Sequence, residues 1–216
     1  MALWLNTVFA DFDYSLLSFF HELSLKYGTV LTPIAKFLSV IGDLPILALG
    51  WFGFLLFFLV KDKRCGMMMC GSIIIGAILT TIILKNAVYR TRPYIAVEEY
   101  KMWFEAFNIK PYWDTSFPSG HACAAMAGVT GFYIWTKHKG VGLLAFLYPA
   151  IMAASRMYLC AHYPTDVFAG LIVGVISAFI CIPFVKLFYY FYRKYPDFPF
   201  CAYCLKYEPK EEDTNH

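Results

Sequence analysis

Charged side chains are scarce in this sequence. Asp, Glu, Lys and Arg make up 15% of the 216 residues, whereas hydrophobic residues make up 60% and the mean hydropathy is +0.57. Soluble globular domains have about 25% charged residues, so this composition argues against one. The sequence also lacks internal repeats and low-complexity segments. Met1–Ala10 has neither the basic start nor the small-residue cleavage site of a signal peptide, and we expect no segment to be removed there.

Long apolar stretches stand where charge is missing. A helix needs roughly 20 apolar residues to cross about 30 Å of hydrocarbon. The stretches that approach this length are Leu44–Val60, Gly66–Leu84, Gly120–Thr136, Gly140–Ala154 and Val167–Tyr192. We therefore expect an all-α, polytopic membrane bundle that forms a single domain over residues 1–200. Residues 201–216 are polar and are expected to form a disordered C-terminal tail.

The segment Asp11–Ile41 allows two interpretations. Its first half, "DYSLLSFFHEL", mixes apolar residues with Asp13 and Glu22, as in a helix that lies in the membrane interface. Its second half contains Pro33 and Lys36, which make it a poor independent span. The segment is expected to form one tilted sixth helix or two half-buried helices. The bundle is accordingly expected to have five or six transmembrane helices.

Lys and Arg are concentrated after alternate apolar stretches. These residues are Lys61, Lys63, Arg64, Lys137, Lys139, Arg193 and Lys194. Because short loops rich in Lys and Arg remain in the cytoplasm, we expect this face of the bundle to be cytoplasmic. The long loop Asn86–Phe117 and the short loop Ser155–Pro164 then lie on the extracytoplasmic side.

Three polar clusters mark helix ends on that extracytoplasmic side. They are Lys85 and Arg92 in "KNAVYRTRP", Ser119, Gly120 and His121 in "PSGH", and Arg156, His162 and Asp166 in "SRMYLCAHYPTD". A single cation or His at a span end is more often an anchor or a satisfied polar residue. Their conjunction at one surface is instead typical of a functional site, since charges inside the apolar stretches are nearly absent.

The cations of these clusters predict a phosphate-binding site. Arg92 and Arg156 can each donate paired hydrogen bonds to phosphoryl oxygens, and Lys85 adds a compact positive charge. Ser119–His121 begins a helix whose N-terminal amides and dipole favour an anion. Gly120 lets the backbone approach that anion without an intervening Cβ.

The spacing of His162 and Asp166 predicts an activated imidazole. At i, i+4 the two side chains lie on one side of a helical turn, so Asp166 can accept an N–H from one ring nitrogen and leave the other as a lone pair. We assign His162 as the nucleophile and Asp166 as its orienting partner. His121 is assigned as the acid that protonates the leaving oxygen and then as the base that activates water.

These residues resemble the three-part signature of the type 2 phosphatidic acid phosphatase (PAP2) superfamily. The matching positions are Lys85, Arg92, Pro93, Pro118, Ser119, Gly120, His121, Ser155, Arg156, His162 and Asp166. With the intervening spans the resemblance covers about Lys85–Gly170. It implies a core of six helices, a phosphohistidine intermediate on His162 and no metal or other cofactor.

The short length and outward-facing site resemble the bacterial undecaprenyl pyrophosphate and phosphatidylglycerophosphate phosphatases of this superfamily. The resemblance implies a hydrolase of lipid phosphates in the bacterial plasma membrane, with undecaprenyl pyrophosphate, phosphatidylglycerophosphate or phosphatidic acid as substrate. We expect the bilayer and the lipid substrate as partners and no nucleic acid. A lipid phosphotransferase would use the same residues, and a transporter would also cluster charge in a membrane, although its spans would carry more polar residues.

Two further segments carry separate expectations. In the long loop, "AVEEYKMWFEAFNI" is either an interfacial helix beside a lipid entry route or a plain exposed loop. Cys201 and Cys204 form a CxxC pair, but the tail does not supply the two further ligands of a structural zinc site. We therefore expect no zinc there.

Overall fold

The computed structural model describes residues 2–43, 53 and 63–195. Every regular element in these ranges is a helix, as expected for the all-α class. In chain order the helices are α1 (Ala2–Val8), α2 (Ala10–Asp43), α4 (Lys63–Ala77), η1 (Ile78–Leu84), α5 (Lys85–Val88), α6 (Pro93–Ala96), α7 (Glu98–Ala106), α8 (Gly120–Trp135), α9 (Lys139–Leu144), α10 (Leu147–Tyr158) and α11 (Pro164–Lys194). The predicted span Leu44–Val60 and the tail with Cys201 and Cys204 lie outside the described residues.

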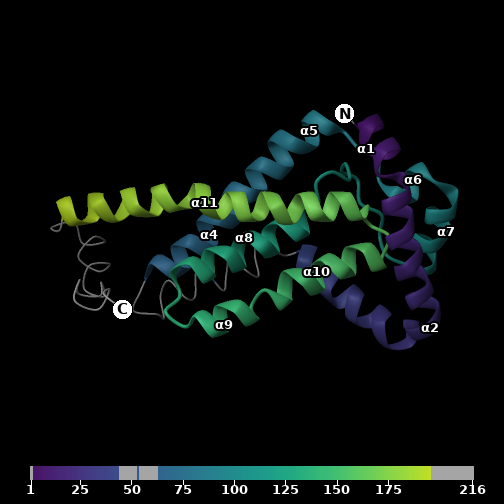
Figure 1. Ribbon diagram of the computed structural model, residues 1–216, viewed down its shortest axis with the longest axis horizontal. Helices are drawn as coiled ribbons and strands as arrows, with labels where there is room; N and C mark the ends of the chain where they lie inside the picture. The colour runs from purple at the N-terminus through teal and green to yellow at the C-terminus, as the bar shows by residue number, and fades with distance from the viewer. Residues whose placement is uncertain (1, 44–52, 54–62, 196–216) are drawn as a thin grey trace.

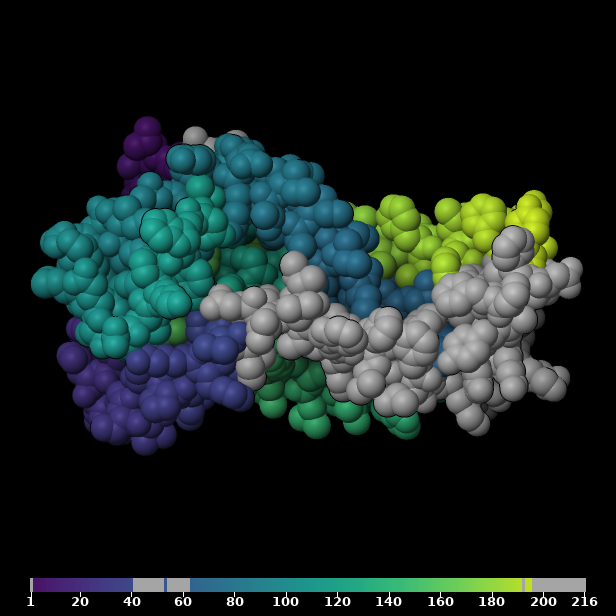
Figure 2. Space-filling model, turned by 180° about the vertical axis from the view of Figure 1, so that it is seen from behind, coloured from purple at the N-terminus to yellow at the C-terminus, as the bar shows by residue number. Residues whose placement is uncertain are grey.

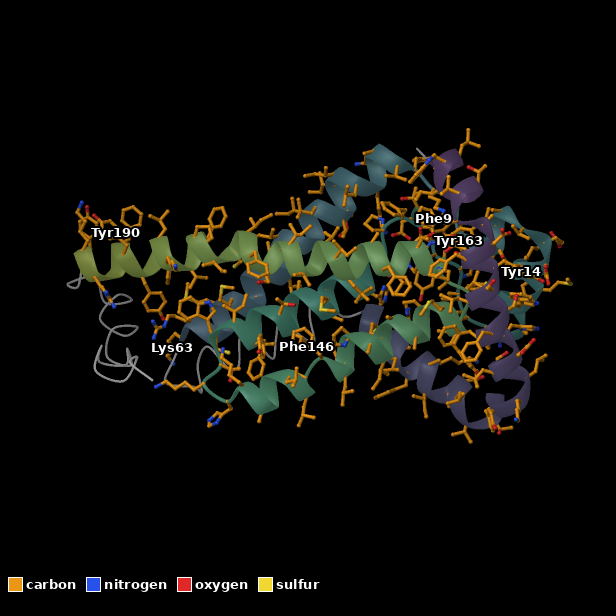
Figure 3. The ribbon with its side chains drawn as sticks, viewed as in Figure 1. Phe9, Tyr14, Lys63, Phe146, Tyr163 and Tyr190 are labelled. Carbon is orange, nitrogen blue, oxygen red and sulfur yellow. The ribbon has the colours of Figure 1, made fainter. Side chains whose placement is uncertain are left out.

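The bundle is elongated and its two ends differ. Figure 1 shows α11 running along it, with α4, α8 and α10 beside α11 and with α2, α6 and α7 gathered at one end. Figure 3 labels Tyr163, Tyr14 and Phe9 at this end, and Lys63 and Tyr190 at the other. The end with Tyr163, Tyr14 and Phe9, called the aromatic end below, therefore lies the length of α11 away from the end where α4 begins and α11 stops.

Small residues hold α8 tightly between α4 and α11. A Cβ added to Gly131 of α8 would lie 2.7 Å from the backbone oxygen of Met68 in α4. One added to Gly174 of α11 would lie 2.6 Å from the backbone oxygen of Cys123 in α8. Close approach through small residues is how helices associate in lipid, where apolar burial between helices gains little. The second contact holds the first turn of α8 against α11, about three turns after α11 begins.

The described helices expose many large apolar side chains. Large hydrophobic side chains remain exposed along the helices, among them Ile82 on η1, Ile151 on α10, and Ile176 and Phe184 on α11. Three helical stretches are long and apolar enough to cross a membrane, namely Lys63–Ala96, Lys139–Tyr158 and Pro164–Phe191. Helix α8 is apolar but only 16 residues long. The predicted count of five or six spans is therefore not confirmed.

The segment predicted to be one tilted helix or two half-buried helices is α2, which consists of two helical parts joined by a kink. Its backbone leaves helical geometry at Tyr27, where φ is −126° and ψ is 18°, whereas Pro33 lies inside the helix without ending it. Leu17 is buried before Tyr27, and Ala35 and Ser39 are buried after it. The two parts of α2 therefore both pack against the protein, and Figure 2 shows α2 (purple and blue) below the teal α6–α7 region at one end of the molecule.

The aromatic loop segment forms helix α7, which confirms that it is helical, while its place in the membrane interface beside a lipid entry route stays a prediction. Tyr100 and Phe104 are buried on one face of this helix. The Trp103 ring stacks on the His21 ring of α2 with centroids 4.2 Å apart, and the Phe104 ring stacks on Tyr94 at 3.9 Å. The apolar face of α7 is therefore occupied by aromatic packing with α2 and α6, which closes this end of the bundle over the polar clusters.

Candidate active site

The three predicted polar clusters meet at the aromatic end of the bundle. A guanidinium nitrogen of Arg92, which follows α5, lies 3.2 Å from Nε2 of His162, which precedes α11. The Ser119 amide at the start of α8 donates to the Asp166 carbonyl at 2.9 Å. Both His162 and Asp166 are buried. Segments far apart in the sequence thus form one polar site at the mouth of the helices.

The His162 ring is held in one orientation by a backbone carbonyl. Nδ1 lies 2.8 Å from the Ser116 carbonyl oxygen, which can only accept, so Nδ1 carries the proton. Nε2 then presents its lone pair toward Arg92. Asp166 lies next to the ring, but its Oδ2 is 3.9 Å from Nδ1, beyond hydrogen-bond distance. The direct Asp166–His162 hydrogen bond expected from the i, i+4 spacing is therefore replaced by the Ser116 carbonyl.

Ser116 connects Asp166 to His162. Its hydroxyl donates to Asp166 Oδ2 at 2.5 Å while its carbonyl accepts from His162, and its own amide donates to the Arg90 carbonyl at 2.7 Å. Asp166 Oδ2 also accepts from the Tyr163 amide at 3.1 Å, which satisfies a backbone donor at the start of α11. Asp166 thus orients the imidazole through Ser116 rather than by direct contact.

A buried ion network supports Asp166 from behind. Arg90 donates to Asp166 Oδ1 at 2.6 Å and to Asp13 Oδ2 of α2 at 2.8 Å. It also donates to Thr165 at 2.7 Å, and its guanidinium stacks 3.9 Å from the centroid of the Tyr163 ring. Asp13 in turn accepts from the Thr165 amide at 2.9 Å. Each charge in this network has an opposite partner and polar contacts, which is the condition for burying charges.

The predicted phosphate-binding cations Lys85 and Arg92 converge on one carboxylate. Arg92 donates from Nη2 to Asp114 Oδ1 at 2.5 Å and from Nε to the Asp114 carbonyl at 2.9 Å. Lys85 forms an ion pair with Asp114 Oδ2. The Arg92 guanidinium also lies 4.6 Å from the centroid of the Tyr112 ring. The two buried cations therefore face one position, which the Asp114 carboxylate occupies and which an anionic group of similar size can fill.

Arg156 lies deeper in the bundle. Its guanidinium donates to Ser155 at 3.2 Å, to Ser39 of α2 at 3.1 Å and to the Tyr112 hydroxyl at 3.3 Å. The side chain is fully buried. Arg156 is thus anchored to α2, and after burial, Arg92, His121 and Lys85 its positive charge also lowers the pKa of His162.

The start of α8 is open where the "PSGH" motif predicts an anion. The Ser119 hydroxyl caps the helix by accepting from the Ala122 amide at 3.5 Å. A Cβ added to Gly120 would meet no atom within 4 Å, so the backbone there faces free space. The half-buried His121 ring lies edge-on to Tyr112, with centroids 6.3 Å apart.

Electrostatics keep the His162 imidazole neutral. Burial and the adjacent Arg92 guanidinium hold the pKa of His162 well below its usual range, and His121, Lys85 and Arg156 act in the same direction. A neutral ring with a protonated Nδ1 leaves Nε2 as a nitrogen lone pair among positive charges. This arrangement suits attack on an electrophile that carries negatively charged oxygens.

Four residues of this site were not predicted in their present roles: Asp13, Arg90, Asp114 and Ser116. In the sequence Asp13 and Arg90 were visible only as rare charges near span ends, Asp13 in the predicted interfacial helix and Arg90 in the long loop. Ser116 acts largely through its backbone carbonyl, which no side-chain pattern reveals. The available signal was the scarcity of charge itself, because a buried Arg or Asp at a membrane helix end needs a partner.

The match to known proteins extends beyond the short motifs. The family model of the PAP2 superfamily matches residues 66–190. The chain belongs to the PAP2 superfamily. The resemblance read from the motifs of the sequence is therefore confirmed.

Curated PAP2 relatives match part of the chain. The bacitracin transport permease protein BcrC of Bacillus licheniformis is 40% identical over 65 residues, which cover 30% of this chain and 31% of that protein. An undecaprenyl-diphosphatase of Sulfolobus acidocaldarius is 32% identical over 69 residues, which cover 32% of this chain and 33% of that protein. The alignments thus span about a third of these relatives.

Two solved PAP2-like structures share the fold over most of the chain. Aquifex aeolicus LpxE superposes with a TM-score of 0.61 at 24% identity, covering 77% of this chain and 94% of that one. A PAP2-type phosphatidylglycerolphosphate phosphatase of Bacillus subtilis gives a TM-score of 0.61 at 22% identity, covering 86% of this chain and 90% of that one. At these identities the likeness shows the fold, that of an integral membrane protein.

Proposed function

We propose that this PAP2 protein is a phosphatase of lipid phosphates or diphosphates that works through a phosphohistidine on His162. The observation that carries the proposal is the His162 ring, buried and neutral, with Nδ1 protonated toward Ser116 and Nε2 beside Arg92. Undecaprenyl diphosphate is the first candidate substrate, because curated relatives carry the name undecaprenyl-diphosphatase. Phosphatidylglycerophosphate and phosphatidic acid are the next.

In the first step Nε2 of His162 attacks phosphorus. A nitrogen–phosphorus bond forms as the bond from phosphorus to the leaving oxygen breaks. His121 gives its proton to that oxygen, and the dephosphorylated lipid, or lipid monophosphate, departs. The positive charge on the phosphorylated ring is balanced through the Nδ1–H bond to Ser116 and the nearby Asp166 carboxylate.

In the second step water replaces His162 on phosphorus. Neutral His121 takes a proton from the water while the water oxygen attacks phosphorus. The nitrogen–phosphorus bond then breaks, and inorganic phosphate leaves. Lys85, Arg92 and Arg156 stabilise the charge on the equatorial oxygens in both steps, together with the amides at the start of α8. We propose that these cations take the role that metal ions have in other phosphatases.

We further propose that the site faces the extracytoplasmic side. The argument is the distribution of basic residues: Lys63, Arg64, Lys139 and Arg193 lie near the start of α4, the start of α9 and the end of α11. Those are the cytoplasmic helix ends if the positive-inside rule holds for this chain. A lipid phosphate in the outer leaflet would then present its headgroup to the cations while its chains stay in the bilayer.

The decisive experiment measures phosphate release by the purified protein in detergent. The substrates are undecaprenyl diphosphate, phosphatidylglycerophosphate and phosphatidic acid, each assayed with and without EDTA. We expect turnover of at least one lipid and no effect of EDTA. Absence of phosphate release from every lipid would refute the phosphatase, and activity that is lost in EDTA and restored by Mg²⁺ would refute the metal-independent mechanism.

Product analysis separates hydrolysis from transfer. The same reaction is run with an added lipid alcohol, and the phosphate-containing products are separated. A hydrolase releases inorganic phosphate in step with lipid turnover. Accumulation of the phosphorylated acceptor in place of inorganic phosphate would identify a phosphotransferase that uses the same residues.

A further inference from the structure

A carboxylate from the protein itself fills the space between the two phosphate-binding cations. Asp114 Oδ1 accepts from Arg92 at 2.5 Å, and Asp114 Oδ2 pairs with Lys85. The Asp114 carbonyl also accepts from Arg92 Nε at 2.9 Å. A carboxylate with its two oxygens on two cations imitates two oxygens of a phosphoryl group. Lys85 and Arg92 are therefore already engaged before a substrate arrives.

The two cations are buried, whereas the carboxylate is the exposed member of this cluster. The side chains of Lys85 and Arg92 are 10% and 3% exposed, whereas that of Asp114 is 52% exposed. Arg92 is held from a second side by the Ala161 carbonyl at 2.8 Å and by His162. Asp114 lies between α7 and α8, in a stretch without regular helix. Its side chain can turn outward without disturbing a helix.

Charge decides which ligands can replace Asp114. Although burial acts to raise it, the charges of Arg92 and Lys85 hold the pKa of Asp114 below its usual range, so the carboxylate is ionised at neutral pH. A terminal phosphate carries close to two negative charges at neutral pH, whereas the phosphodiester headgroups of ordinary phospholipids carry one. A diester has no charge advantage over the resident carboxylate, while a terminal phosphate has one.

We propose that Asp114 is a specificity-determining residue that occupies the phosphate position and yields only to a terminal mono- or diphosphate. The inference rests on the proposed function, because it takes Lys85 and Arg92 as the phosphate-binding cations. It explains how such a site can remain available in a membrane that contains singly charged phosphodiester lipids in large excess. Selectivity would then come from an internal competitor as well as from contacts to the substrate.

The expected effect follows from the fraction of molecules with an open site. If Asp114 occupies the position about nine-tenths of the time, the apparent affinity for phosphate is reduced about tenfold. Asp114→Asn retains the shape and removes the charge, so it should bind inorganic phosphate about tenfold more tightly. Phosphatidylglycerol, a singly charged diester, should inhibit the variant at lower concentrations than it inhibits the original chain.

The test uses the full-length protein in detergent and inorganic phosphate as the probe. Trp113 precedes Asp114 in the chain, so movement of the Asp114 carboxylate changes the charge near this indole and should change its fluorescence. Trp113→Phe assigns the signal to this residue. Isothermal titration of phosphate into the original chain and into Asp114→Asn gives the affinities. Glu105→Gln is the matched control, because it removes one exposed carboxylate from the nearby α7.

Each outcome bears on the proposal. Tighter phosphate binding in Asp114→Asn, with Glu105→Gln unchanged, supports it. Equal or weaker phosphate binding in Asp114→Asn overturns it and makes Asp114 a residue that merely positions the cations. If the variant does not fold, the original chain still decides: phosphate that binds without changing the Trp113 signal refutes displacement. Should no lipid phosphate be hydrolysed, the proposed function fails while these binding measurements remain decisive for Asp114.

Discussion

Replacing Arg90 by Gln should destabilise the fold and the site together. Arg90 is fully buried and donates to Asp13 at 2.8 Å and to Asp166 at 2.6 Å. Both carboxylates are also buried, so the substitution leaves two negative charges without their cation. Removing one partner of a buried ion pair costs about 3–5 kcal/mol. At about 2–4 °C per kcal/mol for a chain of this size, we expect the melting temperature to fall by roughly 10 °C.

The assay is thermal unfolding of the purified protein in detergent. Lys101→Gln is the matched control, since it also removes one cation of an ion pair, but that pair with Glu98 is solvent-exposed and its loss should change little. Adding Asp13→Asn to Arg90→Gln removes one of the stranded charges, so the double variant should melt above Arg90→Gln. An Arg90→Gln protein that melts with the original chain, or strictly additive losses in the double variant, would show that the network does not carry this energy.

The catalytic consequence is separate from stability. Arg90 contacts Asp166, which holds Ser116, which holds His162, so Arg90 is a positioning residue. At a temperature where the variant is folded, we expect kcat to fall on the order of 100-fold, the loss associated with small misplacement of reacting groups, while KM changes little. Arg90→Lys should recover only part of kcat, because one ammonium cannot reproduce the planar guanidinium contacts. A loss confined to KM would contradict this role.

The remaining predictions concern the proposed reaction. His162→Ala should lower kcat on the order of 10⁶-fold. His138→Ala is the control, because His138 is exposed. A folded His162→Ala protein with substantial turnover would exclude His162 as nucleophile. Burial and Arg92 hold the pKa of His162 below 6.5, so the nucleophile stays neutral as the pH falls through 6.5. We therefore expect no loss of kcat/KM attributable to His162 until more acid pH. A His162-dependent loss centred at or above 6.5 would contradict this. His121→Ala should impair hydrolysis of an alkyl phosphate more than that of an activated aryl phosphate, whose leaving group needs little protonation; equal impairment would remove the support for His121 as the acid. After removal of the native cysteines, an impermeant thiol reagent applied to intact cells should label Glu99→Cys but not Lys139→Cys, and the reverse pattern would invert the proposed topology.

The sequence alone was sufficient to recognise the family and to predict that its motifs meet at one end of the bundle. Lys85, Arg92, His121, His162 and their neighbours could be assigned to one end of a helical bundle because apolar stretches of known length separate them. The membrane restricts where a polar residue at a helix end can lie, so alternation of the spans brings such ends together. That constraint is stronger than any available for a soluble domain of similar length.

The details that the sequence could not supply are contacts of backbone and of isolated charges. The hydrogen bond that orients His162 comes from the Ser116 carbonyl, and every residue has a carbonyl. The pairing of Arg90 with Asp13 depends on how α2 packs across the start of α11, which the pattern of α2 left open. The break in α2 lies at Tyr27 rather than at Pro33, since a proline can remain within a helix when neighbouring groups satisfy the freed backbone.

The contacts of Asp13 with Thr165 join residues 152 positions apart, and this has a consequence for the synthesis of the chain. Asp13 is synthesised early, whereas Thr165 and Asp166 are added only after α10. Until then the carboxylate of Asp13 and the guanidinium of Arg90 must remain hydrated or pair with each other at the surface. The end of the bundle that carries the proposed active site is therefore completed only when the start of α11 is added and its contacts with α2 form.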